Sequence, residues 1–211
     1  MKHLNKILIA VVLIMGLNTQ AQDSKNPWAF SFGANAIDTK TSAGGGNGWA
    51  DGHFSQLFAV KNNWNMLSTI SYVSVSKYLG DNFSFGVSGS LNKIDKLVEY
   101  TPANGYVVNN PGNLSYYGID ATLKYSFQSL IKSKIIDPSV SLGLGFSTLG
   151  DNNYRTVNPG AGVTLWFSDN VGLELATRYK KSFGNRGTAV SLDSPSFFQH
   201  SLGLVFKFGE K

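Results

Sequence analysis

The sequence contains no cysteine and few charged residues, and both shortages restrict what the protein can be. Without cysteine there are no disulfides, no catalytic thiols and no thiolate metal sites. Asp, Glu, Lys and Arg make up only 15% of the 211 residues, whereas about a quarter is usual for a soluble domain. This low charge predicts that part of the protein surface faces something other than water.

Long hydrophobic runs are also missing from most of the chain. The exception is the apolar run 7–17, which follows the basic residues Lys2 and Lys6 and precedes the small residues Thr19 and Ala21. This order is typical of a secretory signal peptide, so we expect residues 1–21 to be removed and the mature protein to span 22–211. The run is too short to cross a bilayer as a helix, which takes about 20 residues. Any membrane crossing must therefore use strands.

The charge balance and the histidines exclude further classes. Loss of Lys2 and Lys6 with the signal peptide lowers the formal net charge from +5 to +3. No basic stripe interleaved with aromatic residues accompanies this small excess, so nucleic acid is not expected as a partner. His53 and His200 are too far apart in sequence to suggest a metal site, and we predict neither a metal nor another cofactor.

What the mature sequence has in abundance is alternation with a period of two. In residues 83–91, Phe83, Phe85 and Leu91 fall on one face, while Ser84 and Ser88 fall on the other. Such alternation predicts a β-strand, because successive side chains point to opposite faces. Seven further segments show the same pattern: 28–36, 73–79, 117–127, 140–146, 161–167, 171–179 and 202–208. Eight is an even number, as a closed antiparallel barrel requires, so the predicted fold is all-β: an eight-stranded antiparallel transmembrane β-barrel.

The composition of the two faces predicts which one meets lipid. One face is bulky and apolar, whereas the other is mainly Ser and Gly, which suit the narrow interior of an eight-stranded barrel. A Lys or Arg at the middle of the lipid face costs roughly 2–4 kcal/mol, and Lys77 is the one charged residue that we place on the eight apolar faces. The alternative is a soluble, lipocalin-like barrel with the apolar rows inside.

Turn residues predict how the strands are connected. The segments 80–82 and 168–170 are short and end in Asn, which tolerates the left-handed conformation of tight hairpins. The connections 38–69, 93–115, 148–157 and 181–196 are longer, and 128–137 is intermediate. Membrane barrels have short periplasmic turns and longer extracellular loops, so we expect the four long connections outside the cell.

The alternating strands, the signal peptide and the terminal segment 203–208 resemble the OmpA-like family of eight-stranded outer-membrane barrels over essentially the whole mature chain. The sequence around Ala21 and the residue patterns of the strands look similar to those of barrels from Bacteroidota. The resemblance implies that Phe208, the aromatic residue ending the last strand, is the signal read by the outer-membrane assembly machinery. It also implies that a longer protein continues into a periplasmic, peptidoglycan-binding domain after Lys211, and we expect this chain to be the barrel part of such a protein.

Four charged residues lie on the predicted inner face: Asp120, Lys124, Glu174 and Arg178. In OmpA-like barrels ion pairs plug the lumen, so the resemblance implies a lumen ion-pair network here, with Lys180 and Lys207 as further candidates. Pairing would satisfy charges that are otherwise buried alone. The alternative for these residues is a gated ion path.

The expected function is structural or interaction-based rather than enzymatic. The protein would display its loops outside the cell and contact outer-membrane lipid, lipopolysaccharide, the barrel assembly machinery during insertion, and protein partners in the envelope, as a subunit of a larger assembly or as an anchor. A narrow, low-conductance porin is the first alternative. A lipid-A-modifying enzyme is the second, because Asp51, His53 and Ser55 cluster in one loop, although closeness in sequence does not place them within hydrogen-bond reach.

Overall fold

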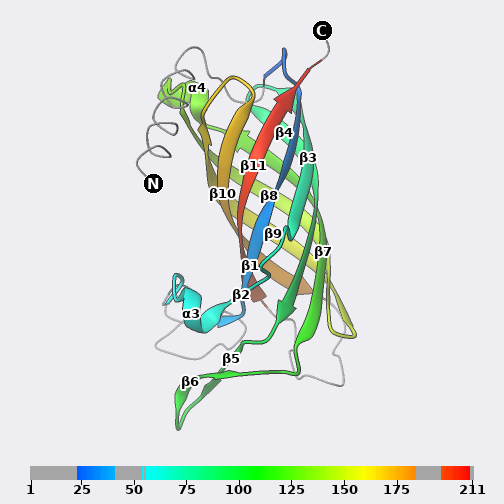
Figure 1. The fold of residues 1–211 in the computed structure, drawn as a ribbon, viewed down its shortest axis with the longest axis vertical. Coiled ribbons are helices and arrows are strands. Elements are labelled where there is room, and N and C mark those ends of the chain that lie inside the picture. Colours follow the sequence, from blue (N-terminus) through cyan, green and yellow to red (C-terminus); the bar gives the residue numbers. More distant parts are fainter. Residues whose placement is uncertain (1–22, 41–53, 55, 184–195, 210–211) are drawn as a thin grey trace, which may run out of the picture.

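The computed structural model describes residues 23–40, 54, 56–183 and 196–209, and a closed antiparallel sheet dominates this part of the chain (Figure 1). Its eight long strands are β1 (Trp28–Asp38), β3 (Tyr72–Gly80), β4 (Phe83–Ile94), β7 (Leu114–Ser126), β8 (Ile136–Leu149), β9 (Asn152–Trp166), β10 (Val171–Phe183) and β11 (Ser196–Phe208). Each strand pairs with the next, and β11 pairs with β1 along its whole length, from Trp28 opposite Phe208 to Asp38 opposite Phe198. The predicted barrel and its eight strands are confirmed.

Shorter elements lie at the two ends of the barrel. The helix α3 (Val60–Asn63) leads into β2 (Trp64–Met66), which pairs with the end of β1, and β5 (Leu97–Thr101) and β6 (Gly105–Asn109) form a separate hairpin. Figure 1 shows this hairpin projecting beyond the lower end of the barrel. The helix α4 (Gln128–Ile131) connects β7 to β8 at the opposite end. Among the described residues, neither helix is long and apolar enough to cross a membrane.

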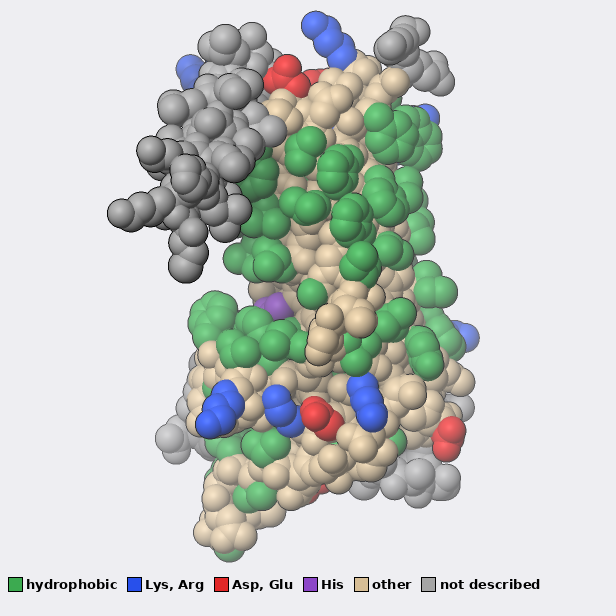
Figure 2. Space-filling model, viewed as in Figure 1, with side chains coloured by type: hydrophobic (Ala, Val, Ile, Leu, Met, Phe, Trp, Pro, Cys, Tyr) green, Lys and Arg blue, Asp and Glu red, His purple; other side chains and the backbone are tan. Residues whose placement is uncertain are grey.

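The apolar rows of the strands face outward. Ile119, Leu144 and Leu175 are 64%, 67% and 52% exposed, whereas Ser88 and Glu174 on the other faces are each less than a tenth exposed. Figure 2 shows the outward hydrophobic side chains as a broad band across the visible face of the barrel. The lipocalin-like alternative is therefore wrong, and the outer face is built to meet hydrocarbon. Lys77 lies on this face with its Nζ 5.2 Å from the centre of the Trp28 ring.

Two of the connections are tight, as predicted. Gly80 pairs with Phe83, so Asp81 and Asn82 form a two-residue turn rather than the expected three-residue one. Both turn residues have positive φ, 49° and 67°, as a type I′ hairpin requires. In the second turn, the amide N–H groups of Phe167 and Ser168 donate to the carbonyl of Val171.

The prediction of a long loop at 148–157 is wrong. Strand β8 continues to Leu149 and β9 begins at Asn152, so only Gly150 and Asp151 connect them. The polar composition of this segment suggested a loop, but Leu149 and Tyr154 point inward and are buried in the lumen. The connections 38–69 and 93–115 do lie at one end of the barrel and contain β2, α3 and the β5–β6 hairpin. Residues 41–53 and 184–195 lie outside the described residues.

Candidate functional site in the barrel interior

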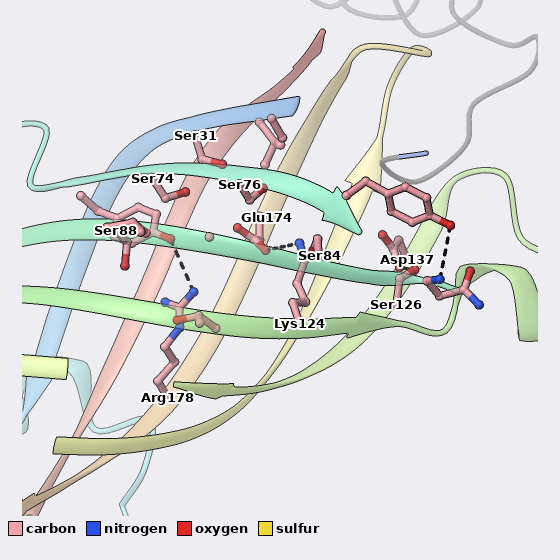
Figure 3. Close-up of a pocket in the computed structure, with 18 of the residues that line it drawn as sticks. Ser31, Ser74, Ser76, Ser84, Ser88, Lys124, Ser126, Asp137, Glu174 and Arg178 are labelled. Carbon is pink, nitrogen blue, oxygen red and sulfur yellow. Dashed lines mark hydrogen bonds and ion pairs between the residues drawn. The ribbon is translucent and has the colours of Figure 1, made fainter. Parts of the chain in front are cut away.

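The half of the lumen nearer the tight turns, which the loop-length rule places on the periplasmic side, contains a polar cavity of about 60 Å³, with room for a few water molecules. Small hydroxyl side chains line much of it: Ser31, Ser74, Ser76, Ser84, Ser88, Thr122 and Ser126. These residues occupy inward positions of β1, β3, β4 and β7, where their small size leaves space unfilled (Figure 3). Near the turn end, the Ser126 hydroxyl donates to the carboxylate of Asp137.

An ion pair crosses the lumen at this cavity. Lys124 on β7 and Glu174 on β10 approach to 3.1 Å between Nζ and Oε1, and Figure 3 shows them pointing toward each other. The side chain of Lys124 keeps 27% of its surface exposed, so water in the cavity reaches this pair. The guanidinium of Arg178, two inward positions further along β10, donates to the hydroxyls of Tyr72 and Ser201 at 3.4 and 3.5 Å.

A second ion pair lies deeper in the barrel and is fully enclosed. Lys180 Nζ is 2.8 Å from Asp120 Oδ2, and the two side chains are 0% and 2% exposed. The Asn158 amide donates to Asp120 Oδ1 at 2.8 Å, and the Lys180 ammonium donates to the Tyr116 hydroxyl at 3.1 Å. A Cβ at Gly145 would lie 2.0 Å from Asp120 Oδ1, so the glycine makes room for this carboxylate.

An apolar plug fills the lumen beyond the second pair. It consists of inward side chains from six strands: Ile37, Ile94, Tyr116, Leu149, Tyr154 and Phe197. All six are at most 7% exposed, and the rings of Tyr116 and Phe197 meet edge to face at 5.7 Å. The lumen thus has a hydrophobic core at its extracellular end, although its periplasmic half is polar.

Three buried asparagines hold β2 and the end of β4 across the extracellular end. The side-chain amide of Asn92 donates to the Asn35 carbonyl and to the Asn65 carbonyl, at 3.1 and 2.9 Å. The Asn65 side chain accepts from the amides of Asp95 and Lys96 and donates to the carbonyl of Ile37. Strand β1 pairs with β3 up to Gly33 and with β2 from Ala36. The asparagine side chains make the hydrogen bonds at the junction between these two backbone ladders.

The four predicted lumen charges all face the interior, but the structure places them in separate layers. Lys124 and Glu174 pair with each other, whereas Asp120 pairs with Lys180, which the sequence suggested only as a further candidate. Lys207 lies elsewhere, with its ammonium 4.4 Å from the centre of the Trp166 ring near the periplasmic end.

Sequence reasoning missed the groups that complete these layers. Tyr116 and Asn158 surround the enclosed pair, and Tyr72 contacts Arg178. Tyr116 lies two positions before Gly118 and Asn158 two positions before Gly160, both on predicted inner faces. Extending the alternation by one step at those strand ends would have found them.

Two of the remaining residues, Phe208 and His200, lie on the outer face of the barrel. Phe208 ends β11 on the outer face, 48% exposed and opposite Trp28. His53 lies outside the described residues. His200 lies at an outward position of β11, but Trp64 stacks on its ring at 4.3 Å and leaves it 4% exposed. Among the described residues, no group of three or more His, Asp or Glu could hold a metal ion.

The closed sheet, the apolar exterior and the filled polar interior define a transmembrane β-barrel of the outer-membrane type. No family model and no curated protein matches the sequence. Among solved structures, the barrel is similar to the Neisserial surface protein A, with 16% identity over 88% of this chain and all of that one, at a TM-score of 0.50. It is also similar to the outer-membrane protein OprG of Pseudomonas aeruginosa, with 10% identity over 90% of this chain and all of that one, again at 0.50. The chain is an eight-stranded outer-membrane barrel.

Proposed function

We propose that this barrel is a membrane anchor with a structural or interaction role, and that it is not an open pore. The observation that carries the proposal is the filled lumen. A solute entering from the periplasmic cavity meets Lys124 and Glu174, then the enclosed pair of Asp120 and Lys180, and then the apolar plug. An apolar constriction alone is a barrier to ions.

The extracellular end supports the interaction part of the proposal. The β5–β6 hairpin extends beyond the barrel (Figure 1) and carries exposed Tyr100 and Val108. The base of the hairpin packs against the end of β1, where the Val98 amide donates to the Thr39 hydroxyl at 3.1 Å. Its outer part, with Tyr100 and Val108, stays exposed and is available for contact with another molecule. The partners that we propose are proteins of the envelope, with the barrel as a subunit of a larger assembly. The barrel could equally anchor a longer OmpA-like protein of the Bacteroidota type.

Planar-bilayer recording tests the anchor against the pore. We expect the folded protein to give no conductance above that of a protein-free bilayer, and a shift in gel mobility on boiling would verify that the inserted protein is folded. Single-channel openings of the wild-type protein would overturn the proposal in favour of a narrow, low-conductance porin, for which the water-accessible cavity beside Lys124 is the favourable observation.

Co-purification from native membranes tests the interaction role. The wild-type protein should retain a stoichiometric partner that is lost when residues 97–109 are replaced by a two-residue turn. The paired positions Leu97 and Asn109 are adjacent across the hairpin, so this replacement leaves the barrel connection intact. Retention of the same partner by the shortened variant would assign the contact to another surface.

We also propose that the chain has no enzymatic activity. The test is mass analysis of lipid A from cells that express the wild-type protein or the His53→Ala variant. Lipid A should be the same in both strains and in cells without the protein. A modification that depends on His53 would contradict the proposal.

A further inference from the structure

The outer face of the barrel is hollowed at Gly89 on β4. In the described part of the eight barrel strands, away from the hairpin turns, Gly89 is the only glycine at an outward position, and it lies between Val87 and Leu91. Its missing side chain leaves two adjoining grooves of about 330 and 280 Å³, which share Val73, Gly89 and Ile119 as walls. Together they extend along β4 from Val87 to Leu91, a distance of about 13 Å.

The walls of these grooves are mainly aliphatic. Val73 from β3 and Ile119 from β7 flank Gly89 and are 44% and 64% exposed. A groove with branched walls and a glycine floor gives a hydrocarbon chain contacts on three sides, which a smooth barrel wall does not provide. The shape and chemistry of the hollow fit a lipid acyl chain.

A cluster of lysines lies just beyond the extracellular end of the grooves. Lys93 follows Leu91 on the outward face of β4 and is exposed, about 13 Å from Gly89 along the strand. Lys96 Nζ donates to the Trp64 carbonyl at 3.0 Å, which places it beside β2, and exposed Lys61 lies on α3 directly before that strand. Figure 2 shows basic side chains, with one acidic side chain among them, in a row just beyond the apolar band.

The charge of this row favours an anionic headgroup. Lys61, Lys93 and Lys96 contribute three positive charges, and the exposed carboxylate of Asp95 contributes one negative charge. Basic residues at the edge of a membrane attract lipid phosphates. The row lies at the end with the longer connections, which faces the outer leaflet.

We propose that Gly89 and these lysines form a binding site for a phosphorylated glycolipid of the outer leaflet, with one acyl chain in the groove and a phosphate at Lys93. The site lies on the outer face of the transmembrane barrel, so it does not depend on whether the lumen is closed. A conducting barrel would therefore overturn the proposed function and leave this site standing.

Substitutions at the two ends of the site separate the acyl and phosphate contributions. A Cβ at Gly89 would meet Val73 Cγ2 at 3.7 Å, an ordinary contact, so Gly89→Leu fills the groove without strain. Ala161→Leu, at an exposed outward position on β9, is the matched control for added apolar bulk. Lys93→Gln removes the charge nearest the groove.

Native mass spectrometry of the mature protein in mild detergent measures the binding. The probes are bisphosphorylated lipid A, fully dephosphorylated lipid A and phosphatidylglycerol, and the gel shift on boiling checks that each variant is folded. Wild-type protein should bind bisphosphorylated lipid A more tightly than phosphatidylglycerol. Lys93→Gln should weaken that binding about fivefold and leave the dephosphorylated lipid unaffected. Gly89→Leu should weaken both lipid A forms, on the order of fivefold.

Two results would overturn the proposal. Equal affinity of the Gly89→Leu, Ala161→Leu and wild-type proteins for bisphosphorylated lipid A would show that the groove holds no acyl chain. Binding of phosphatidylglycerol as tight as that of lipid A would show that the surface does not select the glycolipid.

Discussion

Lys180 and Asp120 form an ion pair of 2.8 Å that no solvent reaches, at the boundary between the polar and the apolar halves of the lumen. Taking both charges out of water is expensive, and their attraction offsets this cost only while both are present. The Asn158 amide and the Tyr116 hydroxyl complete the pair with hydrogen bonds. The layer is therefore sensitive to the loss of either partner.

Removal of one member of this pair should be strongly destabilising. We expect Asp120→Asn to lower the free energy of unfolding by about 3–5 kcal/mol, because it leaves the Lys180 ammonium buried without a counter-charge. Urea unfolding of the protein in lipid vesicles measures the change. The double variant Asp120→Leu with Lys180→Met should recover most of the loss, whereas Lys77→Met on the outer face should change stability by about 0.5 kcal/mol or less. A loss below about 1 kcal/mol for Asp120→Asn would mean that the pair is not held as described.

The boundary between the wet and the dry parts of the lumen is also testable, because the chain has no cysteine of its own. Ser74 lines the periplasmic cavity, whereas Ser147 is 1% exposed beside Tyr116. A cysteine at position 74 should react readily with an anionic, water-soluble thiol reagent. A cysteine at position 147 should react on the order of 100-fold more slowly, because its exposure requires local unfolding.

Mass spectrometry after timed labelling gives both rates. Labelling in urea should proceed equally at the two positions, which verifies that each thiol is intrinsically reactive. If Ser147→Cys reacts as fast as Ser74→Cys in the folded barrel, water passes the Asp120 layer and the proposal of a blocked lumen fails.

The barrel itself could be predicted because its membrane-facing part obeys one simple rule. Phe85 and Val87 point to lipid, whereas Ser84 and Ser88 point to the lumen. A charged side chain on the lipid face costs free energy in the middle of the bilayer. The alternation is therefore unbroken there, and all eight strands were placed from it.

The strand ends and the partners in the lumen could not be predicted in the same way. Beyond the apolar band the outward residues meet water, so polar residues such as Asn153 appear there and the alternation fades, although Tyr154 still points into the plug. The pair of Asp120 and Lys180 joins β7 and β10, which are not adjacent in the sheet. Their proximity depends on the closure and stagger of the barrel, and no local pattern encodes it.

Asn65 should control the stability of the extracellular end. Its side-chain oxygen accepts from the amides of Asp95 and Lys96 at 2.9 and 2.8 Å, and its amide donates to the Ile37 carbonyl at 3.0 Å. Asn65→Ala leaves these groups without partners, and we expect a loss of about 2 kcal/mol or more. Hydrogen exchange of the Asp95 and Lys96 amides should become faster. Asn65→Asp keeps the accepting oxygen and should leave those two amides protected; equally fast exchange in both variants would assign the protection to other contacts.

Phe208 should act during assembly rather than in the stability of the finished barrel. It lies at the periplasmic end of β11, opposite Trp28 where the barrel closes, and the residue is 48% exposed on the outer face. Phe206, two residues earlier on the same face, stacks on Phe32 at 5.9 Å and provides a matched control.

We expect Phe208→Ala to reduce the amount of heat-modifiable barrel in cell membranes, because the assembly machinery would read the aromatic residue that ends the last strand. The purified Phe208→Ala variant should still fold in detergent. Phe206→Ala should instead lower the stability of the purified protein and leave the amount assembled in cells nearly unchanged. If the two variants accumulate in membranes to the same extent, Phe208 has no special role in assembly.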